Sequence, residues 1–166
     1  MMDFTKIPFE DIVKFGQKTM LDRPLFSVSW ILGRFCNYKC SYCWPYANSQ
    51  TPDYFDLHVY YNTINEIKRQ AQRNGFDEFH WSFSGGEPTA YKKLFSLFDH
   101  LVADNKYQSL HMTTNLSPNY KYWKKWLMHT SFFDRVSLTA SFHAEFANEI
   151  EFSDKILMLT DYGAFV

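Results

Sequence analysis

Three cysteines lie within eight consecutive residues of the chain, at Cys36, Cys40 and Cys43, and the 166 residues contain no others. This spacing lets a single loop bring three thiolates to one metal centre. Thiolate ligands suit iron-sulfur clusters and zinc. A closed zinc site takes four ligands, so its fourth ligand would have to be a histidine such as His58. A cubane cluster normally takes four cysteines, so three cysteines would leave one iron open to another ligand.

A second group of candidate residues is the run Ser84-Gly85-Gly86-Glu87-Pro88. The two glycines let the backbone approach a ligand closely and adopt positive φ. The Glu87 carboxylate can accept hydrogen bonds from an ammonium group. The alternative is a plain turn between a strand and a helix, in which Glu87 and Pro88 open the helix.

Three further candidates, Asn115, Ser141 and His143, lie at the ends of predicted strands. Asn115 is either a ligand-binding residue or a turn residue that caps the next helix. His143 is either a site residue or a loop histidine that pairs with neighbouring Glu145. Its position in the strand pattern favours the site.

Alternating strands and helices are predicted to hold these residues. The strands are expected at 25–35, 78–83, 109–114 and 136–142, and the helices at 57–73, 91–104, 120–130 and 152–162. Residues 162–166 are expected to turn into a fifth strand. This alternation predicts an α/β fold with right-handed βαβ units and a parallel sheet. The candidate residues would then meet at the carboxyl edge of that sheet, where such folds place their sites.

Apolar and polar residues alternate along the predicted strands. Val136 and Leu138 face one way, whereas Ser137 and Thr139 face the other. An eight-stranded barrel fills its interior with branched apolar side chains. A polar inner face therefore favours a wider, curved sheet that encloses a ligand or water, and the alternative is a one-sided sheet with a solvated face.

Composition predicts one globular domain, because 46% of the residues are hydrophobic and 21% are charged. The net charge of −1 gives no reason to expect a nucleic-acid partner. No stretch approaches the roughly 20 apolar residues of a membrane span. We expect a cytoplasmic protein, in which disulfides are rare. Residues 1–24 are predicted to form an amphipathic extension, and residues 25–166 the core domain.

The run CNYKCSYC resembles the CxxxCxxC motif of the radical S-adenosylmethionine (radical SAM) superfamily, including the aromatic residue, here Tyr42, before the third cysteine. The run SGGEP, one βα unit later, resembles the GGE motif of that superfamily. The resemblance implies a 4Fe-4S cluster held by Cys36, Cys40 and Cys43. It also implies that the free iron binds S-adenosylmethionine.

The resemblance also implies roles for the other candidate residues. The segment 85–87, with the Glu87 carboxylate, would bind the methionine amino group. Asn115 matches a family TN segment, and Ser141 and His143 match positions that commonly contact the nucleoside.

The activity implied by the resemblance is reductive cleavage of S-adenosylmethionine. The resulting 5′-deoxyadenosyl radical would abstract hydrogen from a substrate such as a peptide, a natural product or a nucleoside-type metabolite. A flavodoxin- or ferredoxin-type protein would supply the electron. Two alternatives come from other classes, namely a non-catalytic iron-sulfur protein for electron transfer or scaffolding and a zinc-binding structural domain.

A radical SAM core is usually a partial (β/α) barrel of six units, whereas four complete βα units are expected here. We therefore predict an incomplete barrel that stops at its fifth strand. An apolar strand at 164–166 would form an unprotected sheet edge. We expect a missing C-terminal segment or a partner chain to complete the sheet.

Overall fold

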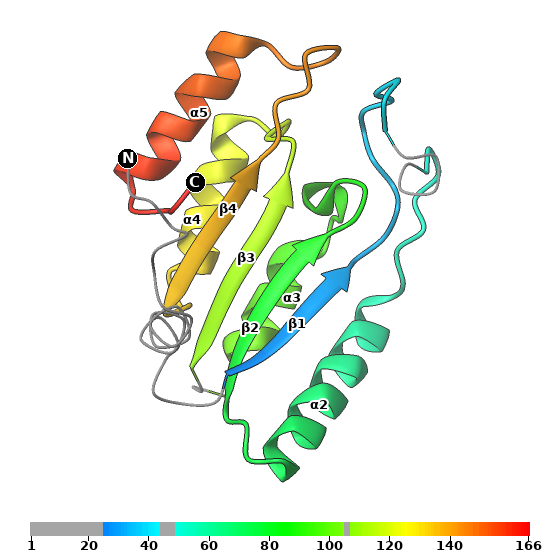
Figure 1. Cartoon of the computed structure of the whole chain (residues 1–166), viewed down its shortest axis with the longest axis vertical. Helices are drawn as coiled ribbons and strands as arrows, with labels where there is room; N and C mark the ends of the chain where they lie inside the picture. Colours follow the sequence, from blue (N-terminus) through cyan, green and yellow to red (C-terminus); the bar gives the residue numbers. More distant parts are fainter. Residues whose placement is uncertain (1–24, 44–48, 105–106) are drawn as a thin grey trace, which may run out of the picture.

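The computed structural model describes residues 25–43, 49–104 and 107–166. These residues form a four-stranded sheet that alternates with helices along the chain (Figure 1). The predicted extension over residues 1–24 lies outside the described residues. The α/β class and the partial-barrel architecture predicted from the sequence agree with this arrangement.

The sheet is parallel throughout, and its strands follow one another in chain order. The strands are β1 (Leu25–Ile31), β2 (Glu78–Ser84), β3 (Gln108–Thr114) and β4 (Arg135–Ala140). Since neighbouring strands point the same way, their carboxyl ends meet at one edge. The loops that leave this edge carry the candidate residues.

Within the described residues, four helices cover the apolar face of the sheet. They are α2 (Leu57–Arg73), α3 (Leu94–Val102), α4 (Tyr120–Thr130) and α5 (Glu149–Asp161). In Figure 1, α3 and α4 lie behind the strands. Each helix contributes to one core with the sheet, and the fully buried side chains include Ile64, Trp81, Phe98, Trp126 and Leu159. This packing fixes the sheet that positions the site.

The opposite face of the sheet is polar, as the alternation predicts. Ser27 and Ser29 of β1 are exposed, although Val28 between them packs against the core. Polar side chains of neighbouring strands pair across this face, as His111 Nδ1 of β3 lies 2.8 Å from Ser137 Oγ of β4. Such pairs satisfy the polar groups of adjacent strands.

Some element boundaries differ from the predictions. β1 ends at Ile31 and β4 at Ala140, whereas the predicted strands continue to 35 and 142. α3 begins at Leu94 rather than 91, because a short 3-10 helix, Pro88–Ala90, precedes it. α5 begins at Glu149 rather than 152, because the Asn148 side chain accepts a hydrogen bond from Glu151 N and caps the helix there.

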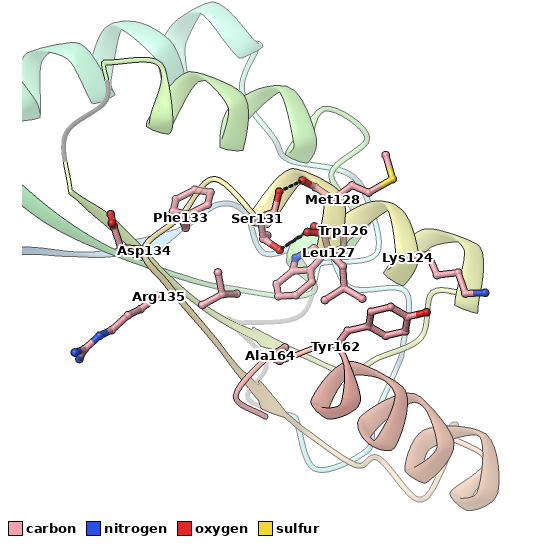
Figure 2. A pocket seen from close by; sticks show the side chains of 13 residues that line it. Lys124, Trp126, Leu127, Met128, Ser131, Phe133, Asp134, Arg135, Tyr162 and Ala164 are labelled. Atoms are coloured by element: carbon pink, nitrogen blue, oxygen red, sulfur yellow. Dashed lines mark hydrogen bonds between the residues drawn. The ribbon is translucent and has the colours of Figure 1, made fainter.

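After α5 the chain returns to the outer edge of β4. Phe165 forms a parallel bridge with Ser137, and Leu138 N donates to Phe165 O at 2.7 Å. This pairing agrees with the predicted start of a fifth strand. A cavity of about 600 Å³ lies beside it, with α4 on one side and the end of α5 on the other (Figure 2). Completion of the sheet by further chain or by a partner remains a prediction.

The described helices include none that is both long and apolar enough to cross a membrane.

Candidate functional site

A cavity of about 180 Å³ lies at the carboxyl edge of the sheet. It is lined by the three cysteines and Tyr38, by residues 85–87 and 113–115, and by Ser141 and His143. All the candidate site residues except Tyr42 therefore line one cavity. They come from loops after all four strands, and these loops extend beyond the strand ends in Figure 1.

The cysteine loop (residues 36–43) is held to neighbouring segments at its start and closed by a turn at its end. Before it, the Asp53 carboxylate accepts hydrogen bonds from the backbone N–H groups of Arg34 and Phe35. Cys36 N donates to Ser49 O at 3.1 Å. At the other end, Cys43 N donates to Cys40 O at 3.1 Å and closes a turn. The loop thus has a defined backbone in which Cys40 is buried.

The environment of Cys36 opposes ionisation of a free thiol. Burial raises the pKa of Cys36, and the nearby Glu87 carboxylate adds to the increase. Tyr38 N donates to Cys36 Sγ at 3.4 Å, and this hydrogen bond opposes the increase in the pKa. A positive metal centre would favour the thiolate that binds it.

The glycine loop after β2 packs against the segment that leads into the cysteines. Gly86 N donates to Gly33 O at 2.9 Å, and Glu87 N donates to Phe35 O at 2.8 Å. A Cβ atom on Gly86 would lie 2.1 Å from Phe35 O, and one on Gly85 would lie 2.2 Å from Gly33 O. Gly85 also has a φ of +134°. Gly85 and Gly86 are therefore needed because their loop lies too close to the backbone of residues 33–35 to leave room for a Cβ atom.

Replacement of Gly86 by alanine is expected to destabilise the fold by about 3 kcal/mol, the upper end of the range for overpacking. The added methyl group would meet backbone atoms, which cannot rotate away as a side chain can. Gly75→Ala is the matched control. Gly75 has a φ of +82°, but a Cβ atom there would meet nothing within 4 Å. Its cost should be about 1 kcal/mol.

Urea denaturation of both glycine variants measures the difference. Equal losses of stability would contradict the close approach of the two loops as the reason for Gly86.

Glu87 lies almost entirely buried between the ends of β2 and β3, at 2% exposure. Its Oε1 accepts hydrogen bonds from Thr89 N, Thr89 Oγ1 and Thr114 Oγ1, and its Oε2 accepts one from Asn115 N at 2.7 Å. Burial raises the pKa of Glu87, and these hydrogen bonds oppose the increase. The carboxylate thus connects the ends of β2 and β3. Glu87 also lines the cavity, and its Oε2 accepts fewer hydrogen bonds than its Oε1.

Asn115 combines the two roles that the sequence leaves open. Its Oδ1 accepts a hydrogen bond from Ser117 N, which makes it a turn residue. Its Nδ2 donates to Asn37 Oδ1 at 3.0 Å and to Cys36 Sγ at 3.9 Å. The buried amide therefore connects the end of β3 to the first cysteine.

The loop after β4 (residues 141–148, the β4–α5 loop) contacts the middle of the cysteine loop. His143 Nδ1 lies 2.8 Å from the Tyr42 hydroxyl and 3.4 Å from Cys40 Sγ. The rings of His143 and Tyr42 are nearly parallel, with centroids 6.0 Å apart. Ser141 N donates to Thr114 O and continues the pairing of β3 and β4 by one residue. Tyr42 therefore belongs to the site through His143, although it does not line the cavity.

Glu145 has a role that the sequence does not reveal. It is considered above only as a partner for His143, yet its carboxylate accepts hydrogen bonds from Ser41 N and from Ser41 Oγ. These hydrogen bonds lower the pKa of Glu145. Since 104 residues separate the two positions, no local pattern could have connected them.

The donor set fits a cluster with an open iron. Three thiol side chains line the cavity, and the chain has no fourth cysteine. Each thiolate of a cubane binds a different iron, so the sulfur atoms need not converge on a single point. Within the described ranges, no three His, Cys, Asp or Glu side chains are arranged to hold one metal ion. His58, the fourth ligand that a zinc site would need, is exposed on α2 and does not line the cavity.

Comparison with known proteins agrees with this geometry. The sequence model of the radical SAM superfamily matches residues 30–140, which extend from β1 to the end of β4. A search of curated proteins finds no match. The matched segment includes the cysteine loop, the glycine loop and Asn115. The chain belongs to the radical SAM superfamily.

Proposed function

We propose that this chain forms the S-adenosylmethionine-cleaving site of a radical SAM enzyme, with a 4Fe-4S cluster on Cys36, Cys40 and Cys43. The observation that carries the proposal is the shared cavity, which the three cysteines line together with Gly85, Gly86 and other residues at the strand ends. When bound and reduced, this cofactor pair supplies a 5′-deoxyadenosyl radical that abstracts hydrogen from a substrate. We propose a peptide, a natural product or a nucleoside-type metabolite as that substrate.

The residues around the cysteines would hold and orient S-adenosylmethionine. Glu87 retains acceptor capacity on Oε2 for an ammonium group, because an ionised carboxylate oxygen can accept more than one hydrogen bond. Asn115 would keep the first cysteine in place through its amide. Ser141 and His143 line the part of the cavity formed by the end of β4, where we propose that they contact the nucleoside.

Two other functions use the same cysteines. In a non-catalytic electron-transfer or scaffold protein, the cluster would form without cleavage of S-adenosylmethionine. In a zinc-binding structural domain, a fourth ligand would have to join the cysteines. The glycine loop supports the enzyme, because Glu87 lines the same cavity as the three cysteines and could there accept hydrogen bonds from an amino group. A flavodoxin- or ferredoxin-type reductant and a cytoplasmic location complete the proposal.

An anaerobic reconstitution tests these alternatives. The chain, and any longer reading frame that contains it, is loaded with iron and sulfide, reduced with dithionite and supplied with S-adenosylmethionine. We expect about four iron atoms per chain and the release of 5′-deoxyadenosine. A loaded cluster without 5′-deoxyadenosine would support the electron-transfer or scaffold protein, whereas one equivalent of zinc with no iron uptake would support the structural domain.

A further inference from the structure

The first residues of the cysteine loop are bonded to neighbouring segments, and the loop ends in the turn that carries Cys40 and Cys43. Cys36 is held by Ser49, and Asn37 is held by Asn115. The turn itself is closed by the hydrogen bond from Cys43 N to Cys40 O. Because this hydrogen bond lies within the turn, contacts from another segment are needed to fix the orientation of the turn.

The β4–α5 loop supplies these contacts. Ser41, at the tip of the turn, donates from N to Glu145 Oε2 at 2.8 Å and from Oγ to Glu145 Oε1. Two donors on one residue thus meet both oxygens of one carboxylate, which fixes orientation as well as distance. Beside this pair the Tyr38 ring stacks on Phe146, with centroids 5.1 Å apart and an interplanar angle of 18°.

The β4–α5 loop is itself well ordered by hydrogen bonds. Phe146 N and Ala147 N both donate to His143 O, at 2.9 Å and 2.8 Å. Asn148 caps α5 directly afterwards. Glu145 therefore lies in a hydrogen-bonded turn next to a capped helix, and this fixed backbone can hold its carboxylate in place against the cysteine loop.

We propose that Glu145 is a positioning residue for the cluster. By binding the N–H and hydroxyl groups of Ser41, it fixes the turn that presents Cys40 and Cys43. This inference rests on the proposed function, because it requires that the cysteines bind a cluster. Partners of metal ligands, which do not touch the metal, commonly change metal affinity by 10- to 100-fold when replaced.

Four single variants of the full chain, and the double variant of Ser41 and Glu145, test the role of Glu145. Glu145→Ala removes both acceptors, Glu145→Gln keeps one oxygen acceptor at nearly the same size, and Ser41→Ala removes the hydroxyl donor but keeps the N–H. Glu149→Ala is the matched control, because Glu149 is an exposed carboxylate in the first turn of α5. Each variant is reconstituted anaerobically, and the release of iron to an excess of chelator is followed.

We expect Glu145→Ala to release iron roughly ten times faster than the wild-type chain. Glu145→Gln should restore part of the retention, and Glu149→Ala should retain iron as the wild type does. Ser41→Ala should have a smaller effect, and adding it to Glu145→Ala should change little, because its hydroxyl then has no carboxylate to lose. The reduced cluster should also give a changed electron paramagnetic resonance spectrum in Glu145→Ala.

Hydrogen exchange on the cluster-free chain tests the contact independently. The Ser41 amide should exchange faster in Glu145→Ala, while the melting temperature stays close to that of the wild type, because exposed pairs contribute little to stability. Equal iron retention and equal exchange in wild type and Glu145→Ala would overturn the inference, as would equally fast release from Glu149→Ala. If the wild-type chain takes up no iron, the proposed function fails instead, and the exchange result still decides whether Glu145 fixes the turn.

Discussion

Replacement of Cys40 by serine is expected to reduce iron binding from about four atoms per chain to background. Cys40 lies between the other two cysteines in sequence, lines the cavity and is 8% exposed. A hydroxyl group occupies nearly the same space as a thiol but is a poor ligand for iron-sulfur clusters, which prefer soft thiolates. The fold should therefore survive while the cluster is lost, together with release of 5′-deoxyadenosine.

Iron and sulfide analysis after anaerobic reconstitution measures this loss, and circular dichroism checks the fold. His58→Ala is the control, since His58 is exposed on α2 and does not line the cavity. It should bind iron as the wild type does. Four iron atoms and an unchanged spectrum in Cys40→Ser would refute the assignment of the cysteines, whereas metal loss in His58→Ala would support a zinc site.

Replacement of Glu87 by glutamine is expected to weaken both the fold and the binding of S-adenosylmethionine. The carboxylate accepts hydrogen bonds from the backbone N–H groups of Thr89 and Asn115, and each oxygen receives one of them. Glutamine has one oxygen, so its amide NH₂ group must face one of these buried donors. An unsatisfied buried group costs about 1–3 kcal/mol, and we expect a loss near the upper end of that range.

Two measurements separate the effects of Glu87→Gln. Urea denaturation of the cluster-free chain gives the loss of stability, and titration of the loaded chain with S-adenosylmethionine, followed by electron paramagnetic resonance, gives the change in affinity. We expect affinity to fall by roughly ten-fold or more, as for loss of one charge-assisted hydrogen bond. Glu149→Gln, an exposed site, should change stability by less than about 0.5 kcal/mol. Unchanged affinity in a folded Glu87→Gln chain would exclude contact with the amino group.

Sequence periodicity was sufficient to predict the strands of the sheet, because each strand has its own local alternation of residues. Apolar and polar residues alternate along each strand, and buried residues such as Phe79 and Trp81 occupy the predicted apolar face. The strand ends were less accurate. β1 stops at Ile31, because the residues that follow pair with the glycine loop and with Asp53, which are distant in sequence.

The candidate site was predictable to the extent that its residues follow strands. Parallel strands bring their carboxyl ends together, so Cys36, Glu87, Asn115 and His143 were expected at one edge. The contacts among them were not predictable from local sequence. Nothing in the spacing indicates that Gly86 must approach Phe35, or that Glu145 binds Ser41 rather than serving only His143.

The hydrogen bonds between Ser41 and Glu145 also bear on the order of events during synthesis. Because 104 residues separate the two positions, a ribosome that adds about 5–20 residues per second needs roughly 5 to 20 s to pass from one to the other. During that interval the cysteines have left the peptidyl transferase centre, but Glu145, the proposed positioning residue, has not yet been synthesised. If the cysteines bind the proposed cluster, we expect it to become stable only after β4 has joined the sheet and Glu145 has been synthesised.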